Sequence, residues 1–170
     1  MGNLIGLTNS ENCKRLLQAV REANYKATRR YVTYVIHHNM NLKKNGTDLK
    51  IVREISSENA DVANVAMKFF RHFASVWCEK GKEDRWCRTK PVRRLNSYIS
   101  TKAVGEIIRL LASENQRCKE FSEDFLNSFL HFFCADEEIS LALKEVSACG
   151  DVNAKYVVAE LEVRISKSNK

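Results

Sequence analysis

The stretch NADVANVAMKFFRHFASVWCE, residues 59–79, decides the fold class. Its apolar residues recur at steps of one, three and four, which gathers them on one broad side of an α-helix. They are Val62, Val65, Ala66, Phe69, Phe70, Phe73, Val76 and Trp77. A helix with so wide an apolar stripe must pack against other elements, so we expect a long core helix. Gly81 is predicted to end it, because glycine is common just after the last turn of a helix.

Similar patterns predict seven further helices along the chain. Their expected ranges are 8–24, 25–39, 48–55, 101–112, 114–134, 136–149 and 151–165. Expected N-cap residues mark five of the starts: Thr8, Asp48, Ser113, Asp136 and Asp151. Thr8 and Ser113 also stand three residues before Glu11 and Gln116, which is the spacing of a capping box. Apolar residues in 156–165 also alternate at period two, so a strand is the alternative there, but strong helix formers favour a helix.

Composition supports an all-α protein. The chain has 170 residues, 44% of them hydrophobic, with one proline and six glycines. Sandwiches and barrels of short strands need frequent turn residues, so this scarcity argues against them. We expect a single all-helical domain over residues 1–170, a compact bundle of about seven to eight helices. An armadillo- or HEAT-like stack of helix pairs is the alternative, although no repeat of that length can be aligned.

The net charge of +7 is distributed unevenly along the chain, which has a basic first half and a mildly acidic second half. Residues 1–94 carry 19 Lys and Arg against 9 Asp and Glu, whereas residues 95–170 carry 9 against 12. The basic half includes an expected long basic loop at 80–96, and the mildly acidic half covers 97–166. The tail, 167–170, is expected to fray.

The densest basic segment follows the helix of residues 59–79. Its candidate contact residues are Lys80, Lys82, Arg85, Trp86, Arg88, Lys90, Arg93 and Arg94. The basic pairs Arg29–Arg30 and Lys43–Lys44 complete the set. Lys and Arg bind phosphates with release of counterions, and an exposed Trp can stack on an unpaired base. We therefore predict a nucleic-acid contact surface, and favour RNA or single strands because no stretch has the basic residues and amides of a recognition helix.

Charge alone does not choose the partner. The same basic segment also fits a solvated loop between helices, or a surface for an acidic protein. An adaptor or regulatory module that binds an acidic or amphipathic peptide, or that self-associates as a homo-oligomer, is therefore the alternative function. Attachment to an anionic membrane surface is a third and weaker interpretation.

No catalytic, cofactor or metal motif stands out. The sequence has no glycine-rich phosphate loop and no serine elbow, so we expect a non-enzymatic protein with no cofactor. His131 and Cys134 have the i, i+3 spacing of paired ligands, but fit the core of an aromatic-rich helix better. Cys78 and Cys87 flank the basic segment, and a zinc or disulfide clip there is the alternative to reduced thiols.

Location is predicted from the absence of sorting signals. No secretory leader is recognisable, and no apolar run approaches the ~20 residues that span a bilayer. The six cysteines are scattered, so we interpret them as reduced and mostly buried. These features predict a cytoplasmic or nuclear protein without a membrane partner.

Overall fold

The computed structural model describes residues 8–38, 40–84, 98–129, 136–149 and 152–168. Within these ranges the chain forms eight α-helices and two 3₁₀ segments, with no strand, so the all-α prediction is confirmed. The chain divides into two compact units, Met1–Ile99 and Ser100–Lys170. The expectation of one domain stays a prediction. None of the described helices is both long and apolar enough to cross a membrane.

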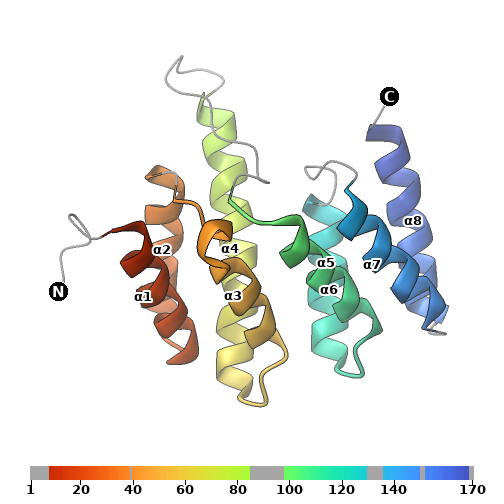
Figure 1. The fold of residues 1–170 in the computed structure, drawn as a ribbon, viewed down its shortest axis with the longest axis horizontal. Helices are drawn as coiled ribbons and strands as arrows, with labels where there is room; N and C mark the ends of the chain where they lie inside the picture. The colour runs from red at the N-terminus through yellow and green to blue at the C-terminus, as the bar shows by residue number, and fades with distance from the viewer. Residues whose placement is uncertain (1–7, 39, 85–97, 130–135, 150–151, 169–170) are drawn as a thin grey trace. The chain divides into compact units, whose positions relative to one another are not determined.

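The first unit holds four α-helices in two pairs (Figure 1). They are α1 (Asn9–Arg21), α2 (Tyr25–His37), α3 (Thr47–Ile55) and α4 (Ala60–Asp84), with the 3₁₀ segment η1 (Lys43–Asn45) before α3. The pairs are α1 with α2 and α3 with α4, and the helices of each pair contact one another. The two pairs stack so that α1 packs on α3 and α2 packs on α4. Within this unit, α1 and α3 therefore form one layer and α2 and α4 form the other.

The core of the first unit is built on the aromatic stripe of α4. Phe69, Phe70 and Phe73 are fully buried, and the rings of Phe69 and Phe70 meet edge to face with centroids 5.1 Å apart. Phe73 makes a similar contact with Tyr98, with centroids 5.7 Å apart. These contacts confirm that residues 59–79 supply the main apolar side of a core helix, as the spacing predicted.

Two expected helix boundaries in the first unit are wrong. Gly81 does not end the fourth helix, because α4 continues to Asp84. A helical glycine costs only about 1 kcal/mol, and the residues that follow Gly81 are compatible with a helix. Asp48 does not cap the third helix, because Gly46 takes a left-handed conformation with φ 61° and α3 begins at Thr47. Asp48 instead lies buried in the first turn.

The start of α1 agrees with the capping-box spacing. The backbone N–H of Glu11 donates to Oγ1 of Thr8 at 3.3 Å, and the backbone N–H of Thr8 donates to Oε2 of Glu11 at 2.9 Å. These two bonds satisfy donors that an open helix end leaves unpaired. The hydrogen bonds from the Thr8 backbone and hydroxyl hold the pKa of Glu11 below its ordinary value.

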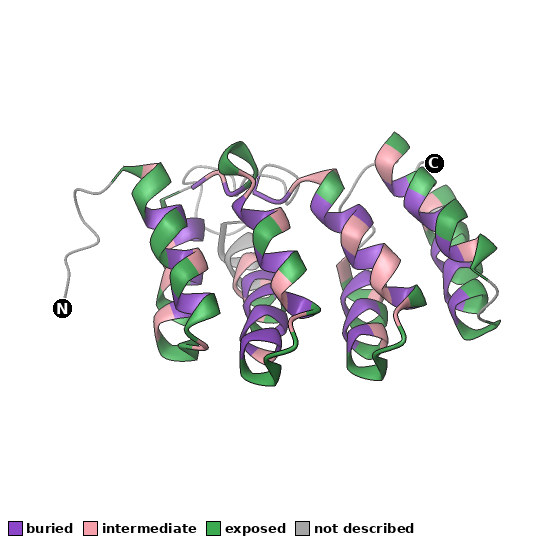
Figure 2. Ribbon diagram, turned by 60° about the horizontal axis from the view of Figure 1, so that its bottom comes forward, coloured by how far each residue is buried: buried purple, intermediate pink, exposed green. Residues whose placement is uncertain are grey.

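The second unit contains the other four α-helices. They are α5 (Thr101–Arg109), α6 (Gln116–Phe129), α7 (Glu137–Ala148) and α8 (Val152–Ser168), with the 3₁₀ segment η3 (Leu110–Ala112) after α5. α5 packs on α6 and α7, and α8 packs on the same two helices. Buried residues run as stripes along the inner sides of these helices (Figure 2). The prediction of a helix rather than a strand at 156–165 is confirmed.

In the second unit, one predicted helix cap is confirmed and another is wrong. Asp136 caps α7 as predicted, accepting from the backbone N–H of Glu138 at 2.9 Å. α6 is capped by Asn115, which accepts from the N–H of Arg117 at 3.0 Å. Ser113 accepts from the N–H of Asn115 instead. The predicted cap at Ser113 is therefore wrong, because an asparagine caps a helix as well as serine and stands directly before its first turn.

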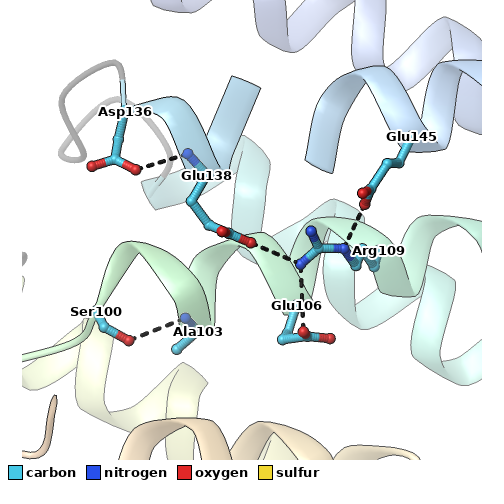
Figure 3. A network of polar contacts seen from close by, with 7 residues as sticks. All are labelled: Ser100, Ala103, Glu106, Arg109, Asp136, Glu138 and Glu145. Carbon is cyan, nitrogen blue, oxygen red and sulfur yellow. Dashed lines mark hydrogen bonds and ion pairs between the residues drawn. The ribbon is translucent and has the colours of Figure 1, made fainter. Parts of the chain in front are cut away.

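Arg109 ties α5 to α7 through carboxylates on both helices (Figure 3). Its Nε donates to Glu145 at 2.6 Å and its Nη1 donates to Glu138 at 3.0 Å, while Glu106 lies 3.4 Å away. The hydrogen bond that Arg109 donates to Glu145, followed by the one it donates to Glu138, raises the pKa of Arg109 above its usual value. Gly105 lets the helices approach here, because a Cβ at that position would lie 3.1 Å from Oε1 of Glu138.

Candidate functional site

The structure accounts for only part of the predicted basic segment. Lys80 and Lys82 belong to the last turns of α4, so the expectation that the loop begins at residue 80 is wrong. The other six candidates lie outside the described residues: Arg85, Trp86, Arg88, Lys90, Arg93 and Arg94. Their role stays a prediction from the sequence.

The pair Arg29–Arg30 lies on the exposed side of α2. The opposite side of this helix is buried through Thr28, Val32, Val35 and Ile36. Lys43 and Lys44 are also exposed, but they lie in η1, beyond the far end of α2. Arg30 and His37, the last residue of α2, are seven positions apart, about 10 Å along the helix, so the two pairs form separate basic positions.

The structure adds two exposed lysines that the sequence interpretation missed, Lys26 on α2 and Lys68 on α4. Lys26 stands one turn before Arg30 and is exposed, as is Lys68 on the neighbouring helix α4. Nζ of Lys68 lies 5.2 Å from the centroid of the Tyr25 ring, which joins the two helices at their surface. We call the set Lys26, Arg29, Arg30 and Lys68, with the Tyr25 ring, the α2–α4 basic surface.

The partly exposed ring of Tyr25 is part of this site. Tyr25 is 36% exposed, so part of its ring remains open to solvent beside Lys68. Tyr25 and Arg29 are four residues apart, which places them on the same side of α2. The surface therefore combines an aromatic ring with cations on both neighbouring helices. Asp61 is exposed on α4 as well, two helical turns before Lys68.

Two arginines elsewhere in the structure, Arg21 and Arg109, form ion pairs. Nε of Arg21 lies 2.7 Å from Oε1 of Glu54, and Arg109 binds the carboxylates described above. Among the residues that the structure describes, no carboxylate forms an ion pair with Lys26, Arg29 or Arg30. These three cations therefore keep their charge available for an external group.

The start of α2 carries cations and no acidic residue. Helices favour acidic residues in their first turn, because the N-terminus carries the positive end of the helix dipole. α2 has no acidic residue in its first turn, and it places Lys26 and Arg29 near that end. The sequence does contain a signal for this, because no Asp or Glu occurs between Glu22 and Asp48, a stretch with five Lys and Arg.

The thiols and proposed metal ligands are only partly described. Cys13 and Cys118 are buried, as predicted, whereas Cys149 is exposed at the end of α7. Cys78 is half-buried, but Cys87 lies outside the described residues, as do His131 and Cys134. In the part of the chain that the structure describes, no three His, Cys, Asp or Glu residues are grouped to hold a metal ion.

No protein-family model, no curated protein and no solved structure matches this chain.

Proposed function

We propose that this protein is a non-enzymatic binding protein whose α2–α4 basic surface binds the phosphates of a single-stranded nucleic acid, RNA above all. One observation carries the proposal. Lys26, Arg29 and Arg30 are exposed on α2 and form no ion pair with a described carboxylate, and Lys68 of α4 lies over the Tyr25 ring, one turn before Arg29. Cations arranged in this way attract a polyanion by releasing its condensed counterions.

The helix dipole adds to this attraction. Cations near the N-terminus of α2 repel the positive end of the dipole, at a cost of a few tenths of a kcal/mol or more each. A bound phosphate would remove that repulsion and gain from the dipole at the same time. The arrangement therefore costs stability in the free protein and favours the anion-bound one.

The Tyr25 ring favours a single strand over a duplex. A partly open aromatic ring between cations stacks on an unpaired base, and such a contact contributes about 1–3 kcal/mol per base. Bases in a duplex are already stacked and do not offer their faces. The sequence also predicts contacts from Lys80, Lys82 and the basic residues that follow, up to Arg94.

A direct binding measurement tests this function. The wild-type protein is titrated into a fluorescently labelled mixed-sequence RNA strand, into the matching duplex, and into an acidic peptide, at low salt and at about 0.5 M salt. We expect the single strand to bind most tightly and its affinity to fall steeply with salt. Binding of the peptide alone, with an affinity that persists at high salt, would instead support the alternative of a protein-interaction module.

A further inference from the structure

Helix α8 has two apolar sides. Ala154, Val157, Val158 and Leu161 are buried on the side that packs against α6 and α7. The opposite side carries a second apolar stripe, made of Val152, Tyr156, Ala159 and Val163. Val152, Tyr156 and Val163 are 79%, 66% and 52% exposed, and this side of α8 is mostly green in Figure 2. A surface helix normally needs one apolar stripe, so the second indicates a second partner.

The exposed stripe has the spacing of a coiled-coil seam. Its four residues are separated by four, three and four positions, which keeps them on one line of the helix. This spacing reads the same in both directions. Two copies of α8 that run antiparallel, with a two-fold axis between Val157 and Val158, therefore place Val152 of one copy opposite Val163 of the other. The same axis places the large Tyr156 opposite the small Ala159, so the two stripes fit one another.

Charge beside the stripe also matches a second copy. Lys155 and Glu162 are exposed and lie seven residues apart, two helical turns, along the same edge of the stripe. In the antiparallel pair, Lys155 of each copy lies beside Glu162 of the other, so two opposite-charge pairs form. In a parallel pair, Lys155 would instead lie nearest Glu160 of the other copy, so the charges fit a second copy in either orientation. The antiparallel orientation is favoured because it places Tyr156 opposite Ala159, whereas a parallel pair would place the two Tyr156 rings opposite one another.

We propose that α8 is a self-association helix that pairs antiparallel with α8 of a second copy of this chain. An open hollow of about 360 Å³, lined by Tyr156, Ala159, Glu160, Val163 and Arg164, lies along the stripe and receives the side chains of the other copy. The Tyr156 hydroxyl donates to Oε1 of Glu160 at 3.0 Å, which holds the ring in position along the helix. The interface is isologous, as expected of a two-fold dimer. It lies in the second unit and does not depend on the nucleic-acid proposal.

A charge-reversal experiment tests both the partner and the orientation. Sedimentation velocity is measured for the full-length wild type and for the single variants K155E and E162K. Each variant places two like-charge pairs in the antiparallel dimer, so we expect association about tenfold weaker than in the wild type. A mixture of K155E and E162K restores both opposite-charge pairs, so the two weak variants should associate with one another as the wild type does.

Controls separate this result from general charge effects. K144E makes the same charge change on the exposed side of α7 and should leave association unchanged. V163E places a charge within the stripe and should abolish association, while circular dichroism shows that the helices remain. A monomeric wild type at every concentration would overturn the proposal. Association that neither single reversal weakens, or that the mixture does not restore, would overturn the antiparallel pairing.

Discussion

The ammonium group of Lys68 lies over the ring of Tyr25, with Nζ 5.2 Å from the ring centroid. This contact brings together two residues that are far apart in the sequence, one from the start of α2 and one from the second quarter of α4. It places the cation of α4 next to those of α2. The charges that the sequence distributes over two helices thus become one surface.

We predict that nucleic-acid binding depends less steeply on salt when the arginines of α2 are removed. Each phosphate contact to a single strand contributes about 0.7 to the slope of log affinity against log salt. The variant R29Q/R30Q removes two such contacts and should reduce the slope by about 1.4. Fluorescence anisotropy at four or five salt concentrations measures this value. An unchanged slope would mean that neither arginine touches a phosphate.

The Tyr25 ring should contribute through stacking. We predict that Y25A weakens binding to a single strand by about 1–3 kcal/mol, because it removes the aromatic platform beside Lys68. Y25F keeps the ring and should bind like the wild type. Titrations with the same labelled strand give both affinities. Equal affinity of Y25A and wild type would remove Tyr25 from the site.

Arg109 should matter for stability and not for binding. R109M leaves Glu106, Glu138 and Glu145 close together without their shared cation, and removes up to three ion pairs of partly exposed groups at up to ~1 kcal/mol each. We expect the free energy of unfolding of the second unit to fall by about 1–2 kcal/mol in urea. Nucleic-acid affinity should stay at the wild-type value, and a loss of affinity would show that the α2–α4 basic surface is not the whole site.

We predict that the lowered pKa of Glu11 makes the stability of the fold depend on pH. Its pKa is lowered in the folded protein by the hydrogen bonds from Thr8, so the ionised carboxylate stabilises the fold above its ordinary pKa. This contribution is lost as the pH falls through the lowered folded value. E11Q should therefore be less stable than the wild type at pH 7, and the difference should vanish in acid. Urea unfolding at a series of pH values measures it, and a difference independent of pH would contradict the capping box.

Much of the fold follows from local patterns in the sequence. The aromatic stripe of α4 and the capping residues Thr8 and Asp136 act within one helix, so spacing alone is enough to predict them. The end of α4 was missed because a helical glycine is only weakly unfavourable, and the start of α3 because Gly46 adopts a left-handed conformation. These outcomes depend on balances of about 1 kcal/mol, which a pattern does not resolve.

The site was harder to predict than the fold. Arg29 and Arg30 are visible as a basic pair, but their proximity to Lys68 depends on which helices pack together. Such pairing is a property of the tertiary structure. The absence of acidic residues between Glu22 and Asp48 was the available signal, because it indicates a helix whose exposed side carries one sign of charge.

The most direct test of the account compares two charge-matched double variants. R29E/R30E reverses two charges on the α2–α4 basic surface, and K50E/R53E makes the same change on α3, which lies in the other layer of the first unit. Affinity for a mixed-sequence RNA strand is measured at low salt, with helicity checked by circular dichroism. We predict that R29E/R30E lowers the affinity about tenfold more than K50E/R53E. Equal losses in the two variants would show that binding follows net charge alone and would contradict the proposed surface.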